Sequence, residues 1–269
     1  MYTTTAMNRG SRALKRRFYN GIRKIYPQFG YDKSDIYISS YPKSGRNWIH
    51  FLIANTFATY SSRNEIINFH TISKWISEDF PKKSPVPDVS LPRIVAQHKL
   101  YGGQNVRTIY IMRHPADVMV SYYHYNVGRK KMELESLSSM IRNTELGVPA
   151  WVRHVESWQN NWELLVKYED LKRDALNELS RIIRFIGVDS KISGKILEKA
   201  VEKSSFESMR EIEKKWGLPK KPGKNPNFTF MREGKSTEGK EMFSPSDYSY
   251  LKEKAGYLLD RYGYGLEAS

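Results

Sequence analysis

Short apolar runs alternate along the chain with longer segments in which apolar residues recur every three or four positions. The short runs are typical of buried strands, and the longer period is typical of helices with one buried face. The predicted strands are Ile36–Ser39, Arg93–Gln97, Arg107–Met112 and Leu164–Tyr168. The predicted helices are 47–60, one from about Ala116, Met132–Thr144, Ala150–Asn160, Ala175–Ile186 and a C-terminal helix that begins within SPSDYS. This alternation predicts a single α/β domain with a central parallel sheet flanked by helices.

Two segments of the chain depart from this alternation of strands and helices. Residues 211–240 contain seven lysines interspersed with Gly and Pro, and long loops of this kind in compact domains are commonly lids, so we predict a mobile lid at about 211–240. The first 31 residues hold seven Lys or Arg and no acidic residue. A transit peptide, a membrane-surface helix and a solvated basic arm all fit that composition, and we favour the arm. The predicted organisation is a basic arm over 1–31 and one domain over 32–269.

The composition limits the chemistry that the chain can perform. It has no cysteine, which excludes disulfides, thiolate catalysis and cysteine-ligated metal. No apolar run approaches the ~20 residues that cross a bilayer, and the N-terminus lacks a secretory apolar core, so we expect a cytoplasmic protein without stable membrane insertion. The net charge of 44 − 29 = +15 suggests an anionic partner, either nucleic acid or a small molecule with several phosphates.

The first predicted strand runs into YPKSGRNWIHF, residues 41–51. A turn between a strand and a helix is a common phosphate site, because backbone N–H groups and the helix dipole both favour an anion there. The Walker pattern requires Gly-Lys followed by Ser or Thr, whose hydroxyl binds Mg²⁺. Here Gly45 is followed by Arg46 and Asn47. The turn therefore predicts an anion site that works without Mg²⁺, although a basic turn that merely caps a helix would look the same.

A second segment, RHPADVMVSYYHY at 113–125, also joins a predicted strand to a predicted helix. With YPKSG–W at 41–48, KYEDLKRD at 167–174 and FMREGK at 230–235, it strongly resembles the sulfotransferase family that uses 3′-phosphoadenosine-5′-phosphosulfate (PAPS) as donor. The resemblance runs from about Asp35 to Tyr262. It implies a P-loop NTPase-like sulfotransferase fold, transfer of a sulfuryl group to a small-molecule acceptor, release of 3′,5′-bisphosphoadenosine (PAP) and no metal.

The resemblance also implies a role for each motif residue. The residues implied to contact the 5′-phosphate are Lys43, Ser44, Gly45, Arg46 and Asn47. Those implied to contact the 3′-phosphate are Arg113, Ser121, Arg232 and Gly234. By the same resemblance, Trp48 and Phe206 would stack on the adenine, and Tyr168 and Ser204 would lie near the adenine amine. Lys43 would also stabilise charge that develops on the leaving phosphate. An ordinary core aromatic is the alternative reading of Trp48.

One of the six histidines is the expected general base, since the attacking hydroxyl or amine must lose a proton. His98 follows the strand RIVAQ, and the ends of parallel strands are where α/β sites collect catalytic groups. It also matches the histidine that the resemblance implies is catalytic. We expect His50, His124 and His154 to be packed in the core instead.

The chain departs from the family pattern at several places. Ala96 and Gln97 stand where a lysine and a threonine normally precede the catalytic histidine, Arg46 and Asn47 replace two threonines, and Glu233 replaces a lysine. The family's dimer-forming stretch aligns with KEMFSPSDYS and keeps little beyond Lys240, so the oligomeric state is open. The acceptor pocket is expected in 64–89 and 127–148, which include Phe69, Trp75, Phe80 and Met132, although these apolar residues would equally suit an ordinary core.

Two other functions stay open. A nucleotide kinase or ATPase with a degenerate phosphate loop is one, although the missing Gly-Lys-Ser/Thr triplet disfavours it. A basic nucleic-acid-binding protein is the other, because of the positive charge and the interspersed aromatic residues. We favour the sulfotransferase and expect no nucleic-acid partner.

Overall fold

Five parallel strands form the centre of the structure, a computed structural model that describes residues 35–63, 65–78, 90–103, 106–220, 222–231 and 238–265. The strand order is β2-β3-β1-β4-β5. The strands are β1 (Ile36–Ser40), β2 (Ile76–Glu78), β3 (Ile94–Gln97), β4 (Arg107–Met112) and β5 (Leu164–Lys167). In the register, Ile38 of β1 lies between Ala96 of β3 and Ile109 of β4. The expected basic arm over 1–31 lies outside the described residues.

Helices cover both faces of the sheet. They are α2 (Arg46–Tyr60), α3 (Pro115–His124), α4 (Leu137–Arg142), α5 (Val148–Trp158), α6 (Tyr168–Arg173), α7 (Ala175–Ile186), α8 (Gly194–Lys203), α9 (Phe206–Trp216), α10 (Glu238–Met242) and α11 (Pro245–Arg261). The shorter elements are η1 (Ile72–Lys74), η3 (Asp189–Lys191) and a π-helix, η2 (Tyr125–Arg129). No helix among these described residues is long and apolar enough to span a membrane.

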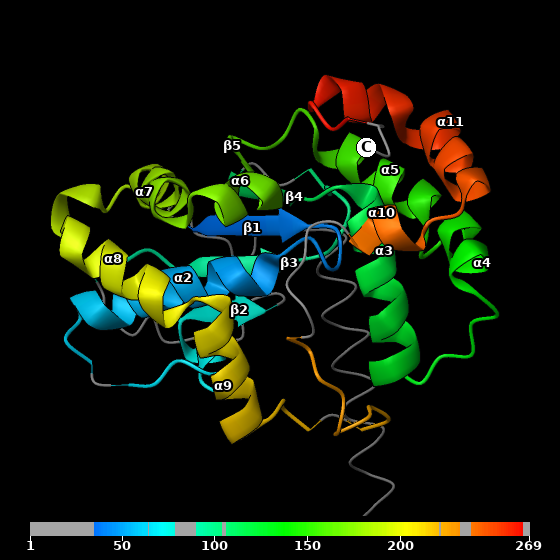
Figure 1. The fold of residues 1–269 in the computed structure, drawn as a ribbon. Helices are drawn as coiled ribbons and strands as arrows, with labels where there is room; N and C mark the ends of the chain where they lie inside the picture. Colours follow the sequence, from blue (N-terminus) through cyan, green and yellow to red (C-terminus); the bar gives the residue numbers. More distant parts are fainter. Residues whose placement is uncertain are drawn as a thin grey trace, which may run out of the picture.

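The alternation of side chains along β4 shows how the two faces are buried. Ile109 and Ile111 belong to a core shared with α2, α7 and α8. Tyr110 and Met112 belong to a second core shared with α3, α5 and α11. Successive residues of a strand point to opposite faces, so a strand that is apolar at every position must be covered on both sides. Figure 1 shows the two groups of helices on different sides of the molecule. The predicted α/β class is therefore confirmed.

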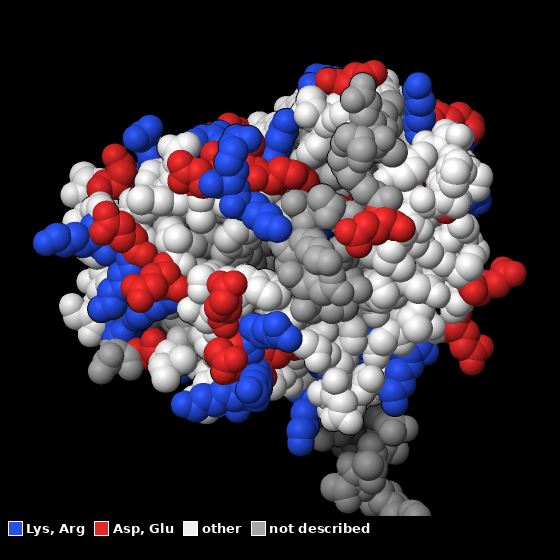
Figure 2. All heavy atoms as spheres, in the orientation of Figure 1, with Lys and Arg blue, Asp and Glu red and all other residues white. Residues whose placement is uncertain are grey.

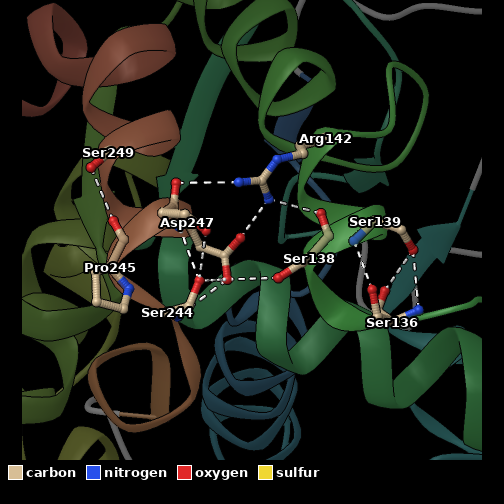
Figure 3. Close-up of polar contacts among 9 residues, drawn as sticks. Ser136, Ser138, Ser139, Arg142, Ser244, Pro245, Asp247 and Ser249 are labelled. Carbon is tan, nitrogen blue, oxygen red and sulfur yellow. Dashed lines mark hydrogen bonds and ion pairs between the residues drawn. The ribbon is translucent and has the colours of Figure 1, made fainter.

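The junction between α4 and α11 is held by one buried carboxylate. Asp247, the third residue of α11, accepts hydrogen bonds from the hydroxyls of Ser138 (2.8 Å) and Ser244 (2.7 Å) and pairs with Arg142 (Figure 3). Ser244 in turn accepts a hydrogen bond from the Asp247 amide, which completes a capping box. The stretch KEMFSPSDYS, which the sequence left open as a dimer contact, thus makes contacts within the chain.

Three predicted boundaries are wrong. The helix expected over 132–144 is only α4, because Ser136 forms a capping box that starts a new helix there. The strand expected to end at Tyr168 ends at Lys167, and Tyr168 begins α6. The loop expected from 211 is still helical up to Trp216, because α9 is capped by Ser205 and buries Met209 and Glu213 on one face. At the other end of the expected lid, α10 begins at Glu238.

Candidate functional site

The carboxyl ends of three neighbouring strands bring the predicted motifs together. β1 lies between β3 and β4, and all three are parallel. Lys43 and its loop follow β1, His98 follows β3, and Arg113 follows β4. Parallel strands end at the same edge of a sheet, so residues from 41–47, 98 and 113 reach one place.

The loop after β1 has an unusual backbone. Lys43 has φ 72° and Gly45 has φ 99°, both in the left-handed region. Strained non-glycine residues of this kind are concentrated at ligand sites, where the rest of the fold holds them in place. Ser44 is buried, and its hydroxyl has no hydrogen-bond partner among the described residues. The first turn of α2 carries no acidic residue. The loop therefore suits an anion at the N-terminus of α2.

Tyr168 is the point at which the two motifs meet. A Cβ atom at Gly45 would lie 2.4 Å from Cδ2 of its ring. The Trp48 ring meets the Tyr168 ring edge-on with centroids 5.7 Å apart. The guanidinium carbon of Arg113 lies 4.4 Å from the centroid of the Tyr168 ring. Tyr168 thus contacts the loop after β1, the first helix and the end of β4 together.

Arg113 is buried and stands beside an acidic neighbour. Its guanidinium lies 3.7 Å from a carboxylate oxygen of Asp117 in the first turn of α3. The other carboxylate oxygen of Asp117 accepts a hydrogen bond from the Gly239 amide (2.8 Å), which fastens α10 to α3. Ser121 lies further along α3 with its side chain partly exposed.

The residues expected near the adenine lie along α2 and between α8 and α9. The Asn55 amide in α2 donates to the hydroxyl of Ser204 (3.0 Å), which is fully buried at the end of α8. Phe206 begins α9, and both Phe206 and Trp48 pack against the core shared by α2 and α8. Arg232 and Gly234 lie outside the described residues.

His98 is held by the end of the neighbouring strand. Its Nδ1 atom lies 2.7 Å from the carbonyl oxygen of Ser40, the last residue of β1. A carbonyl oxygen can only accept, so Nδ1 carries the proton and Nε2 is left as an acceptor. The Ser40 hydroxyl lies 3.3 Å from the same nitrogen.

The surroundings of His98 keep it neutral. Neighbouring protein groups that displace water, and then the charge of Arg46, lower the pKa of the imidazole below its ordinary value. The residue is nevertheless exposed to solvent, and water at the ring stabilises the charged form, which opposes the effect of burial. The pKa stays below its ordinary value, so the imidazole is unprotonated at neutral pH.

Of the three histidines expected to be packed in the core, His50 and His154 are buried and His124 is only partly buried. His50 is 2% exposed in α2. His154 is 3% exposed in α5, and its Nδ1 atom lies 2.8 Å from the Tyr110 hydroxyl. His114 accepts a hydrogen bond from the Ala116 amide at the start of α3. The described residues include no group of three or more His, Cys, Asp or Glu side chains that could hold a metal ion.

Sequence reasoning missed the aromatic surroundings of Lys43. The Lys43 ammonium lies 3.7 Å from the ring centroid of Phe230 and 4.8 Å from that of Tyr125. Phe230 lies within the segment expected to form the lid, and Tyr125 begins the π-helix η2. Phe230 is the first residue of the FMREGK motif, but nothing in the one-dimensional pattern places this aromatic side chain over a loop lysine.

Comparisons with known proteins agree with this geometry. The family model described as "Sulfotransferase domain" matches residues 33–263. Sulfotransferase 1B1 of Canis lupus familiaris is 25% identical over 86% of this chain and 87% of its own length. Sulfotransferase 2A6 of Rattus norvegicus is 26% identical over 88% of this chain and 90% of its own length.

Two solved structures share the fold. A mouse sulfotransferase, SULT7A1 in complex with PAP, has a TM-score of 0.59 and 22% identity, and covers 86% of this chain and 90% of its own. A retinol dehydratase in complex with retinol and PAP has a TM-score of 0.64 and 18% identity, with 85% of this chain and 82% of its own covered. The family match spans most of the chain and includes all the strands and the motif residues that follow them, and this chain therefore belongs to the sulfotransferase family.

Proposed function

We propose that this protein transfers a sulfuryl group from PAPS to a hydroxyl or amine of a small-molecule acceptor. The observation that carries the proposal is the meeting of Lys43, His98 and Arg113 at the carboxyl ends of three adjacent strands. Two cations and one neutral histidine at one edge of the sheet supply what the reaction requires: charge stabilisation on the donor and a base for the acceptor.

Each residue has a defined part in the transfer. The acceptor oxygen or nitrogen attacks sulfur, and Nε2 of His98 accepts the proton that the acceptor loses. The bond between sulfur and the bridging oxygen breaks, its electron pair stays on the 5′-phosphate of the released PAP, and the Lys43 ammonium stabilises the negative charge there. The lysine that is absent at Ala96 leaves Lys43 with a larger share of this stabilisation.

The loop after β1 and Arg113, which both contact Tyr168, support the assignment of PAPS as donor. The loop with Ser44, Gly45, Arg46 and Asn47 suits the 5′-phosphate, because α2 begins there and the buried Ser44 hydroxyl needs a partner. Arg113, with Ser121, suits the second phosphate, and Arg232 and Gly234 would close over it. Trp48, Phe206, Tyr168 and Ser204 would surround the adenine. The PAP in both structural neighbours agrees with this donor.

The acceptor class is proposed more broadly. Of the residues expected in the acceptor pocket, Trp75 is 5% exposed and belongs to the core. Phe69 is partly buried, packs against the same core and meets the Phe230 ring with centroids 5.9 Å apart, and Met132 is partly buried. Phe80 lies outside the described residues. One structural neighbour is in complex with retinol, a small apolar molecule, and this supports a small apolar compound as the acceptor of this protein.

The face of the molecule seen in Figure 2 does not favour the nucleic-acid alternative. On the face shown in Figure 2, Lys and Arg side chains are interspersed with Asp and Glu and form no continuous basic patch among the residues described there. Binding to a nucleic-acid backbone requires a cluster or stripe of positive charge.

A binding experiment without Mg²⁺ tests the proposal. PAP at a hundredfold excess over its dissociation constant should raise the free energy of unfolding by ~2.7 kcal/mol, and ATP at the same concentration should raise it far less. A screen of phenols, sterols and amines with labelled PAPS then identifies the acceptor. Stabilisation by Mg²⁺-ATP but not by PAP would instead support the kinase reading, and stabilisation by an oligonucleotide alone would support the nucleic-acid reading.

A further inference from the structure

One buried carboxylate, that of Glu213, holds residues 230–231 against α9. Glu213 is 7% exposed on the inner face of α9. One of its carboxylate oxygens accepts a hydrogen bond from the Phe230 amide (2.5 Å), and the other accepts one from the Met231 amide (2.7 Å). Two amide donors on one carboxylate fix both the position and the direction of the backbone at 230–231.

The side chain that this carboxylate positions lies on the loop lysine. Phe230 presents its ring face to the Lys43 ammonium at 3.7 Å, the shorter of the two ring contacts of that ammonium. Phe230 is also in edge contact with Phe69 (5.9 Å) and Tyr125 (6.5 Å). A cation over an aromatic face is attracted by the ring quadrupole, most strongly where water is displaced. Glu213 therefore acts on Lys43 through Phe230, although the two charged groups are on different elements.

The other part of the segment is tied to the π-helix η2. Arg129, 5% exposed, donates to the carbonyl oxygens of Asn225 and of Pro219 (2.7 Å). The Asn225 amide donates back to the Arg129 carbonyl (2.9 Å). Phe228 packs against Gly128, where a Cβ would lie 2.9 Å from its ring. The segment thus leaves α9, crosses to η2 and returns to Glu213 with Phe230 in place.

We propose that Glu213 is a positioning residue for sulfuryl transfer: by holding the Phe230 and Met231 amides it keeps the Phe230 ring on the Lys43 ammonium, and so directs that ammonium toward the bridging oxygen of the donor. This inference rests on the proposed role of Lys43. Phe206, the expected adenine contact, begins α9, so the helix that carries this contact also carries Glu213, which positions the Lys43 side chain.

The decisive variant is Glu213→Gln, with Glu211→Gln as the matched control. Both remove one negative charge from α9, but Glu211 is exposed and Glu213 is not. NMR of the ligand-free protein reports the Lys43 contact directly, since the ε-methylene protons of a lysine on a ring face are shifted upfield. We expect Glu213→Gln to reduce this ring-current shift by at least half, and Glu211→Gln to leave it unchanged.

Kinetics with PAPS separate positioning from folding. We expect Glu213→Gln to lower kcat about tenfold at saturating PAPS, well below the melting temperature of the variant, and Glu213→Ala to lower it further, whereas Glu211→Gln stays within twofold of the wild type. Phe230→Leu should reproduce the loss in kcat and in the NMR shift, and Phe230→Tyr, which keeps the ring face, should restore both.

Two results would overturn the inference. One is an unchanged Lys43 shift in Glu213→Gln. The other is a loss of thermal stability in Glu213→Gln with wild-type kcat, which is what a merely structural carboxylate would give. Failure of the proposed function itself looks different, because the wild-type protein would then bind no PAP and transfer no sulfuryl group while its Lys43 shift still responded to Glu213.

Discussion

The Nδ1 atom of His98 lies 2.7 Å from the carbonyl oxygen of Ser40, and the two residues end or follow adjacent parallel strands. The strand pairing therefore decides which tautomer the imidazole adopts. Ser39 pairs with Gln97 in the register of β1 and β3, so Ser40, the last residue of β1, lies at the next step of that register together with His98, the first residue after β3. Nε2 is left as an unprotonated acceptor, which is the state that a general base needs.

Replacement of His98 should remove catalysis without removing the donor. We expect His98→Asn to lower kcat by ~10²–10⁴-fold, the usual contribution of a positioned general base, with the Kd of PAP within threefold of the wild type. Single-turnover assays and calorimetric titration with PAP measure the two effects. A variant with wild-type kcat would show that another group takes the proton. The acid limb of kcat/KM in the wild type should lie below pH 6.5, since burial and Arg46 lower the pKa of His98.

Arg113 should determine selectivity for a second phosphate. Arg113→Lys keeps the charge but loses the fork of donors, and we expect PAP to bind about 10- to 100-fold more weakly, while adenosine 5′-monophosphate binds as before. Arg107→Lys is the matched control, because Arg107 lies at the opposite end of the same strand and donates to the Phe185 carbonyl. Equal losses for both nucleotides would contradict the assignment of Arg113 to the 3′-phosphate.

Gly45 is required for two reasons that can be separated by experiment. In Gly45→Ala the alanine would have to keep a left-handed φ of 99°, and its methyl group would lie 2.4 Å from the Tyr168 ring. Gly187→Ala at the end of α7 has a comparable φ of 85° but meets nothing within 4 Å. Both should lower the free energy of unfolding by ~1–2 kcal/mol through backbone strain. Only Gly45→Ala should also weaken PAP binding, as calorimetry would show; equal PAP affinity in the two variants would refute the role of this contact.

Buried histidines should make the fold sensitive to mild acid. Burial lowers the pKa of His154 to about 4 and holds that of His50 well below its ordinary value. Between about pH 6.5 and 4 the unfolded chain binds protons there that the folded chain does not, so the free energy of unfolding falls as the pH falls. Each such histidine contributes a slope of up to about 1.4 kcal/mol per pH unit.

Urea unfolding at pH 7, 6 and 5 measures this slope. His154→Gln, which retains an acceptor for the Tyr110 hydroxyl, should reduce the slope by the part that belongs to one histidine. A free energy of unfolding that is constant over this range would contradict the proposed neutrality of the buried imidazoles.

The sequence by itself determined the strand–helix alternation around β1, β3, β4 and β5, the two faces of the sheet and the motif residues at the strand ends, but β2 was not predicted. These features are local: the period of apolar side chains and the position of turn residues are encoded within a few neighbours. Asp35–Ser39 and the turn that follows are sufficient to identify β1 and the loop with Lys43 and Gly45. The family resemblance supplied the expected roles of His98 and Arg113, which stay predictions, and the match over residues 33–263 confirms the family.

Only the tertiary structure decided which distant groups act together. Phe230 lies over Lys43, Glu213 holds Phe230, and Ser40 sets the tautomer of His98, and each pair is far apart in sequence. The helix α9 was not predicted, because its Lys- and Glu-rich surface hides the buried face that Met209 and Glu213 share. Such contacts depend on how helices and loops pack at the edge of the sheet, and a one-dimensional pattern of polarity carries no information about that packing.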